Sequence, residues 1–482
     1  MKLADLHNRI DSFVGAQVER QIVAHHRRRL VKLGHERVLR AERGWATTAA
    51  PPRHGNELAV LVDGAEALAE IAAAIESARS SVWLAGWFFT PDFRLRSDSE
   101  RTLRDLLADL AVARIDVRLL AWAGAPLPLF HPDRSEVRQM RDDFATGTRI
   151  RVALDDRERP FHCHHEKLVI VDGTVAFVGG IDLTTYAGDR LDRGEHPARG
   201  SLGWHDAATR ITGPAVADVA EHYRLRWHEV TGERLPEAPA LRPATGATEL
   251  QIVRTVPEKI YDALPRGEFS ILESYLAALR SAERLVYLEN QFLWSPEIVE
   301  VLEDKLRNAP DERFRLLVLL PAKPNNGEDD TRGQLGRLAA ATAAAPERFL
   351  ACTLHQRGDG AKPVYVHAKV GIVDDRWLTI GSANLNEHSL FNDTEMNVVC
   401  ADPAIARATR LRLWSEHLEC PIEDVAGDPA ELVDTRWRPL AQEQLELRRQ
   451  GRPFTHRLHA LPNVSRRADA LRGPLSGLLV DG

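Results

Sequence analysis

Two short segments of the chain, residues 165–172 (HEKLVIVD) and 367–374 (HAKVGIVD), contain the same histidine-x-lysine-x4-aspartate pattern. The matched residue numbers differ by 202 throughout, and a glycine follows each aspartate by seven positions. The reactive residues are His165, Lys167 and Asp172 in the first copy and His367, Lys369 and Asp374 in the second. Two copies in register are a much stronger signal than one, and indicate a duplicated functional motif.

Two imidazoles and two ammonium groups are the groups needed to cleave a phosphodiester without a metal. One histidine can attack phosphorus, while the other, protonated, delivers a proton to the leaving alkoxide and later activates water. Lysines supply positive charge around the phosphoryl oxygens. Residues two apart on a strand face the same side, so we expect each lysine beside its own histidine. This chemistry does not choose which histidine attacks.

Residues 162–164 (His-Cys-His) directly precede His165 and are of types that bind metals. The corresponding residues 364–366 of the second copy are Val-Tyr-Val, so this ligand set is not duplicated. We therefore expect no metal and no other cofactor at the paired motifs.

Strand-like and helical segments alternate around the first copy, and the same order returns around the second, which is typical of α/β layers. Predicted strands are 58–62, 81–89, 115–121, 285–292 and 314–320; predicted helices are 65–78, 103–113, 271–282, 302–308 and 406–418. The aspartates end strands whose hairpin partners are 175–178 and 377–380. The predicted fold is two duplicated α/β/α sandwich halves with mixed sheets, related by a pseudo-twofold axis and sharing one active site.

Composition shifts divide the chain into five parts. They are an N-terminal helical leader (1–55), a first half (56–232), a linker rich in Pro, Ala and Gly (233–248), a second half (249–420) and a C-terminal extension (421–482). In the leader, residues 25–33 mix basic and apolar positions. This pattern fits a helix on a membrane surface, but the short charge run favours a helix packed on the body.

The composition excludes several classes of protein. The 482 residues carry a net charge of −7, which is not the basic balance of a dedicated nucleic-acid binder. The four cysteines are scattered rather than arranged as a disulfide framework. No signal peptide or stretch of about 20 apolar residues occurs. We expect a cytoplasmic protein that meets any membrane from outside.

The paired motifs resemble the HKD motifs of the phospholipase D superfamily, closest in pattern to the phosphatidylcholine-type enzymes. The likeness extends to residues 85–91 (AGWFFTP), 204–206 (WHD), 286–292 (VYLENQF) and 365–390, and covers about 57–418. It implies the phospholipase D fold, with His165 as nucleophile.

The same resemblance implies roles for other residues. His367 would be the general acid, and the two motif lysines would bind phosphate together with Asn384, Ser382 and Gly180. Asp182 stands where the second half has Asn384, a departure that we interpret as a residue orienting a neighbour.

Two further groups of acidic residues have implied roles. The motif aspartates, Asp172 and Asp374, would either take part in catalysis or hold the hairpins. Asp192 and Glu395 are the expected acidic partners of the imidazoles.

The function implied by the resemblance is hydrolysis or transphosphatidylation of glycerophospholipids through a phosphohistidine. The expected partner is phospholipid at a membrane surface, with no obligate nucleic acid, and the expected state is a monomer that contains an intramolecular pseudo-dimer. Alternatives are a cardiolipin-synthase-like phosphatidyltransferase, a nuclease using the same site, and a binding module with an inactive site.

Overall fold

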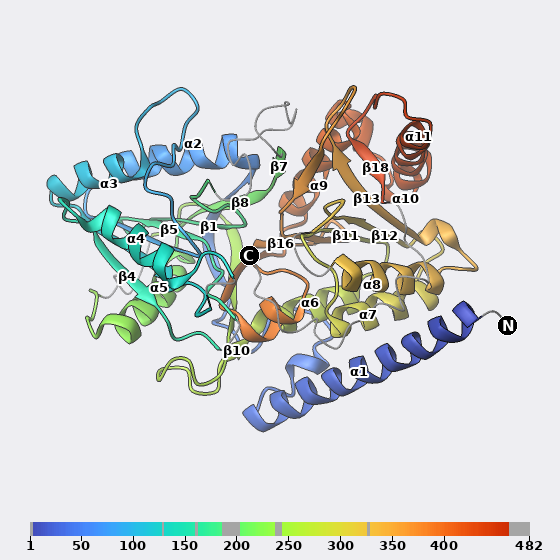
Figure 1. The fold of residues 1–482 in the computed structure, drawn as a ribbon, viewed down its shortest axis with the longest axis horizontal. Helices are drawn as coiled ribbons and strands as arrows, with labels where there is room; N and C mark the ends of the chain where they lie inside the picture. The colour runs from blue at the N-terminus through green and yellow to red at the C-terminus, as the bar shows by residue number, and fades with distance from the viewer. Residues whose placement is uncertain are drawn as a thin grey trace.

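The computed structural model describes residues 3–127, 130–159, 162–185, 203–236, 243–324 and 328–461, and shows two α/β halves side by side (Figure 1). The first half contains β1 (Arg53–Val62), α2 (Asp63–Glu76), β2 (Ser81–Gly86), α3 (Leu103–Val112), β3 (Asp116–Trp122), α4 (Arg134–Ala145), β4 (Arg151–Asp155), β5 (Leu168–Val171), β6 (Val175–Gly179), β7 (Gly203–His205), β8 (Ala207–Thr212) and α5 (Val216–Thr231).

The second half contains β9 (Thr248–Val256), β10 (Glu268–Phe269), α6 (Ser270–Ser281), β11 (Leu285–Glu289), α7 (Pro296–Arg307), β12 (Arg315–Leu319), α8 (Glu328–Ala341), β13 (Phe349–His355), β14 (Pro363–Val366), β15 (Val370–Val373), β16 (Trp377–Gly381), a π-helical turn η3 (His388–Asn392), β17 (Glu395–Cys400) and α9 (Pro403–Leu418). Each predicted strand and helix overlaps an observed one, with ends that shift by a few residues.

The strand order of the two sheets shows the duplication directly. The first sheet runs β4-β3-β2-β5-β6-β8-β1, and the second runs β13-β12-β11-β15-β16-β17-β9. In both, the first three strands are parallel and the rest antiparallel. The predicted α/β fold with two matching halves and mixed sheets is therefore confirmed.

Strand pairing also joins the halves. β1 pairs with β8 of its own half and with β9 of the other, through a register shift between Arg53 and Asn56. β7 and β14 pair in parallel, with His205 opposite Val366. Since β14 leads into one histidine motif and β7 belongs to the other half, this pairing positions the two halves of the site against each other.

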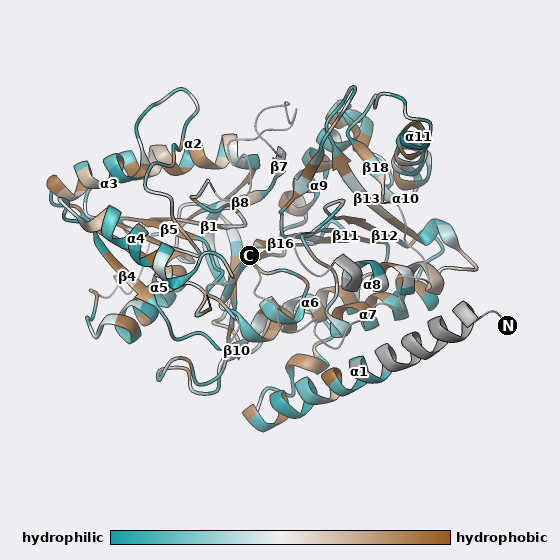
Figure 2. Cartoon of the chain, in the orientation of Figure 1, coloured by the Kyte–Doolittle hydropathy of each residue, from teal (hydrophilic) through white to brown (hydrophobic). Residues whose placement is uncertain are grey.

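Apolar side chains hold the layers together. Helix α2 buries Leu68, Ile71 and Ile75, a spacing of three and four that forms one apolar face against the first sheet. The opposite faces of both sheets share one apolar cluster with α5 and α9, including Tyr223 and Trp414. Figure 2 shows hydrophobic residues along strands such as β4 and β5.

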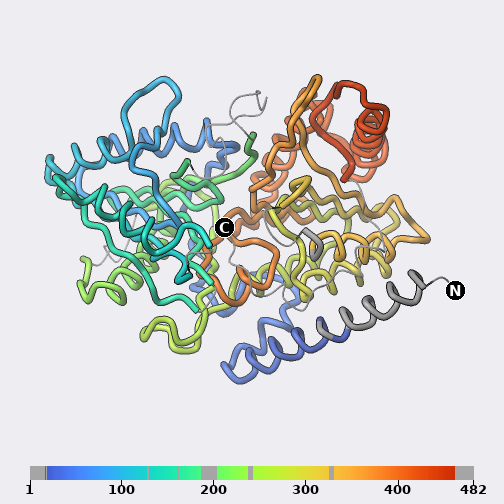
Figure 3. Tube along the Cα trace, in the orientation of Figure 1, coloured from blue at the N-terminus to red at the C-terminus, as the bar shows by residue number. Residues whose placement is uncertain are grey.

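The leader forms helix α1 (Leu3–Leu33), which lies beside the second half (Figure 3). His26 Nδ1 lies 2.8 Å from Glu297 Oε1 of α7, and Arg29 pairs with Glu258 at 2.6 Å. Leu30 is fully buried. These contacts agree with a leader packed on the body. Within the described parts of the chain, no helix has both the length and the apolarity that a membrane span requires.

The C-terminal region contributes a strand as well as helices. It contains α10 (Pro429–Leu432), α11 (Arg438–Arg449) and β18 (Leu458–Ala460). β18 pairs antiparallel with β13, with Thr353 opposite His459. The segment is therefore an integral part of the second sheet.

Candidate active site

The two histidine motifs meet at the interface between the halves. The amides of His165 and the next residue both donate to Thr394 O of the second half, at 2.9 and 3.1 Å. In the same way, the amides of His367 and the next residue donate to His205 O of the first half, at 2.8 and 3.2 Å. We expected the histidines on strands, but β5 begins only at Leu168. The preceding amides bond across the interface instead of to a neighbouring strand.

Each histidine faces a carboxylate from the opposite half. His165 Nδ1 lies 2.9 Å from Glu395 Oε1, at the start of β17, and His367 Nδ1 lies 2.7 Å from Asp206 Oδ2, directly after β7. All four side chains are buried. A carboxylate on Nδ1 sets the tautomer and orientation of the ring and stabilises the imidazolium.

Of these two carboxylates, sequence reasoning named Glu395 as a partner and missed Asp206. The residue proposed in its place, Asp192, lies outside the described residues. Asp206 belongs to the WHD segment, which resembles the family, but the resemblance assigned it no role. The constant offset of 202 fails there, because Glu395 and Asp206 are separated by only 189 positions.

The two carboxylates have different surroundings. Glu395 accepts from the Ser382 hydroxyl and, at 2.5 Å, from the Ser389 hydroxyl. Burial raises the pKa of Glu395 well above its usual value, against the smaller opposing effects of Lys167 and the two hydroxyls. A raised pKa favours the protonated, neutral form of the Glu395 carboxyl.

Asp206 is instead surrounded by N–H donors. Its Oδ1 accepts from the Ala207 amide at 2.8 Å, and its Oδ2 accepts from Trp204 Nε1 at 3.3 Å. Gly180 leaves the room for this carboxylate, since a Cβ on Gly180 would lie 2.2 Å from Asp206 Oδ1. The matched residue of the second half is Ser382, whose hydroxyl bonds to Glu395.

The motif lysines are both buried, and each donates to the carbonyl of its own histidine. Lys167 Nζ lies 2.7 Å from His165 O and 3.3 Å from Asp182 Oδ2. Asp182, the departure noted in the sequence, thus pairs with Lys167. This contact explains how a carboxylate is accommodated where the other half has an asparagine.

Lys369 faces amide oxygens instead. Its Nζ lies 2.6 Å from His367 O and 3.3 Å from Gln291 Oε1, which also accepts from Asn384 Nδ2 at 3.4 Å. Burial lowers the pKa of Lys369 to about 7; the carboxylate of Asp206 opposes this shift and the charge of Lys167 adds to it. The mutual influence of the two lysines places both motifs in one electrostatic environment. Gln291, in the ENQF segment, was not predicted as a site residue.

The motif aspartates lie away from the paired histidines. Asp172 accepts hydrogen bonds of 2.7–2.9 Å from the amides of residues 79–81, and Asp374 accepts three of 2.7–2.8 Å from the amides of residues 283–285. Asp172 follows Lys167 by five residues along β5, which corresponds to about 16 Å of extended strand. These bonds fit the hairpin-holding role considered for the two aspartates; the catalytic role stays a prediction.

The run of potential ligands before His165 does not form a common metal group. His164 Nδ1 lies 2.8 Å from Thr394 Oγ1, while the Cys163 amide donates to Asp393 Oδ1 at 2.9 Å. His162 lies beside His388. No group of metal-ligating residues within the described ranges combines Cys163, His164 and His165.

Comparisons with known proteins show what the chain is similar to. Residues 275–415 match the family model described as "Cardiolipin synthase, PLD-like domain". Phospholipase D A of Dictyostelium discoideum is 26% identical over 463 residues, covering 76% of this chain and 36% of that protein. Phospholipase D alpha 4 of Arabidopsis thaliana is 25% identical, covering 71% of this chain and 62% of that protein. The chain thus spans between about a third and two thirds of the length of these relatives.

A solved structure shares the fold. The crystal structure of phosphatidylserine synthase from Haemophilus influenzae Rd KW20 matches with a TM-score of 0.51 and 12% identity, covering 73% of this chain and 84% of that one. This likeness supports the arrangement of the strands and helices.

Proposed function

Because the chain belongs to the phospholipase D superfamily, we propose that it is a metal-independent phosphodiesterase that cleaves glycerophospholipids to phosphatidic acid and a headgroup alcohol. The observation that carries the proposal is the pair of buried histidines, each oriented by a carboxylate of the other half. A two-step phosphoryl transfer requires one neutral histidine, which attacks phosphorus, and one protonated histidine, which donates a proton to the leaving group.

In the first step, His165 attacks phosphorus with Nε2, because its Nδ1 is directed at Glu395. A nitrogen–phosphorus bond forms and the bond from phosphorus to the headgroup oxygen breaks. His367, as imidazolium, transfers its proton to that oxygen, and Asp206 stabilises the imidazolium beforehand. The products are a phosphatidyl-histidine and a neutral headgroup alcohol.

In the second step, the now neutral His367 takes a proton from water, and the water oxygen attacks phosphorus. The nitrogen–phosphorus bond breaks, which returns His165 and releases phosphatidic acid. An alcohol in place of water would give a new phosphodiester by the same route. Hydrolysis and transphosphatidylation therefore differ only in the acceptor.

Lys167, Lys369 and Asn384 are the proposed phosphate-binding residues. An anionic phosphodiester beside Lys369 would favour its charged form and so raise its lowered pKa. The pairing of Lys167 with Asp182 fixes the position of one ammonium group. Each well-placed donor to the phosphoryl oxygens contributes roughly 10²- to 10³-fold to the rate.

The names of the relatives support lipid rather than nucleic acid as substrate. The net charge of −7 points in the same direction, because proteins that track nucleic-acid backbones depend on clustered positive charge.

The decisive experiment incubates the full chain with mixed-phospholipid vesicles and ethanol, without added metal, and detects phosphatidic acid and phosphatidylethanol by mass spectrometry. We compare the parent with His165→Ala, His367→Ala and a control, His54→Ala, whose side chain is 78% exposed. Both products are expected from the parent and the control, and neither from the two site variants.

Phosphatidylethanol from the parent would support a phosphatidyl-enzyme route. A folded parent that forms no product on any vesicle composition would overturn the lipid proposal. Cleavage of single-stranded DNA by that same preparation, lost in His165→Ala, would assign the site to nucleic acid instead.

A further inference from the structure

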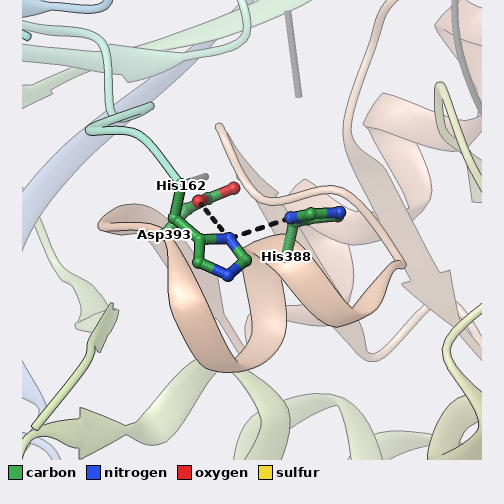
Figure 4. A group of neighbouring side chains, drawn as sticks. All are labelled: His162, His388 and Asp393. Atoms are coloured by element: carbon green, nitrogen blue, oxygen red, sulfur yellow. Dashed lines mark hydrogen bonds and ion pairs between the residues drawn. The ribbon is translucent and has the colours of Figure 1, made fainter. Parts of the chain in front are cut away.

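Three metal-ligating side chains gather beside the active site, from segments far apart in the chain. His162 precedes the first histidine motif, His388 belongs to η3, and Asp393 follows η3. His162 Nδ1 lies 2.9 Å from His388 Nδ1 and 3.3 Å from Asp393 Oδ1. Figure 4 shows the His162 ring directed at both partners.

The spacing of these donor atoms is that of ligands around one small cation. One donor atom from each residue lies within 4.8 Å of the other two. Tetrahedral zinc, with bonds of about 2.0–2.1 Å to nitrogen and oxygen, holds its ligand atoms about 3.3 Å apart. Only small shifts would therefore admit an ion between the three.

A second observation comes from Asp393. Its side chain is fully buried, and its Oδ1 is held by the Cys163 amide at 2.9 Å. Its Oδ2 is buried and has no hydrogen-bond partner in the part of the chain that the structure describes. A buried carboxylate oxygen without a hydrogen-bond partner destabilises the folded state unless it is protonated or binds a cation.

A second cluster of metal-ligating residues shows a different pattern of contacts. His205, Glu289 and His417 also gather in the core, but His205 uses both ring nitrogens, 2.9 Å from Asp63 and 2.9 Å from Glu289. His417 Nε2 lies 2.9 Å from the same glutamate. Hydrogen bonds therefore link the donor atoms of this second cluster to one another.

We propose that His162, His388 and Asp393 form a binding site for a divalent first-row transition metal ion, with Zn²⁺ as the best match. Two imidazole nitrogens and one carboxylate oxygen are typical zinc ligands and leave one position for water. The His162 side chain is 12% exposed, which provides a route of entry.

The bound ion would connect the two halves of the protein. His162 lies three residues before His165, and Asp393 lies two residues before Glu395. A metal held by both segments would fix the distance between the two residues that form the first histidine–carboxylate pair. It would lie beside the reacting histidines, so the chemical steps proposed above still use no metal.

The test measures metal binding to the full chain, stripped with a chelator and dialysed, by titration calorimetry with Zn²⁺. The variants are His162→Gln, His388→Gln and Asp393→Asn. The matched control is His131→Gln, which removes the histidine of a surface group formed with Asp133 and Glu136. Circular dichroism in chelator establishes that each variant is folded.

We expect one tight Zn²⁺ site in the parent and in His131→Gln, weakened at least about 10²-fold in His162→Gln and His388→Gln. Co²⁺ should give the parent a visible absorption band that these two variants lack. If Asp393→Asn does not fold, Zn²⁺ binding to His162→Gln still tests the proposal, because the His162 side chain is more exposed.

The proposal is overturned when the parent binds Zn²⁺ no more tightly than His162→Gln, or when only His131→Gln loses binding. Because this measurement uses no phosphodiesterase activity, its failure would leave the proposed function standing, and the reverse also holds.

Discussion

The two halves repeat one strand order, yet they present their motif histidines to different carboxylates. His165 faces Glu395, which is surrounded by two serine hydroxyls, whereas His367 faces Asp206, which accepts from an amide and an indole N–H. The shorter Asp206 is matched by Gly180, and the longer Glu395 by Ser382 in the corresponding position.

This difference supports the different roles proposed for the two histidines within a symmetric frame. The raised pKa of Glu395 favours a neutral carboxyl, which orients His165 without stabilising a positive charge on it. N–H donors around Asp206 favour a carboxylate, which stabilises an imidazolium at His367. These surroundings fit the proposal of a neutral nucleophile and a charged proton donor.

The lysines differ in a parallel way. Lys167 has a carboxylate partner in Asp182, while Lys369 donates to two neutral oxygens, those of the His367 carbonyl and the Gln291 side chain. The two halves therefore place the same His and Lys positions in two unlike environments.

The largest expected effect separates the two carboxylates. Asp206→Asn should lower kcat/KM by about 10²-fold or more, because the imidazolium of His367 loses its counter-charge. Glu395→Gln should cost about tenfold or less, since a neutral amide resembles a protonated carboxyl. Steady-state kinetics on a soluble phosphodiester would measure both. Equal losses in two folded variants would contradict the assigned asymmetry.

The next effect concerns the buried charge of Lys369. Its folded-state pKa of about 7 lies below the ordinary lysine value of 10.5, so the unfolded chain binds more protons between these pH values. The cost of burying the charge is fully present below about pH 7 and disappears as the pH rises toward 10.

At pH 6 the free energy of unfolding of Lys369→Met should therefore be roughly 3–5 kcal/mol higher than that of the parent. This estimate uses about 1.4 kcal/mol for each unit by which the pKa is lowered. That difference should shrink toward zero near pH 10. Urea unfolding across this pH range measures it, with the exposed Lys32→Met as control. A difference independent of pH would show that Lys369 is not the titrating group.

The smallest effect compares the two hairpin aspartates. Asp172→Asn and Asp374→Asn should each lower the free energy of unfolding by about 1–3 kcal/mol, because each removes charge-assisted bonds to three consecutive amides. Activity per folded molecule should stay near that of the parent. Thermal unfolding and kinetics check this, with the exposed loop variant Asp98→Asn as reference. A large loss of activity in either folded variant would return the aspartates to the catalytic group.

Much of the fold was predictable because it depends on local pattern. Apolar spacing identified helices such as α2 and strands such as β3, and the repeated motif showed that the second half copies the first. The ends of β5 and β15 were less predictable. The residues before them bond to the opposite half, and sequence pattern carries no information about such a partner.

The sequence by itself determined the candidate reactive groups: two histidines and two lysines at a fixed offset, of the types that phosphodiester cleavage requires. Only the tertiary structure decided which carboxylate orients each histidine. Asp206 and Glu395 reach their partners across the interface, and their separation of 189 positions breaks the repeat that sequence comparison relied on. The physical reason is that pairing between buried polar groups depends on strand register and side-chain length, which are set when the two halves pack together.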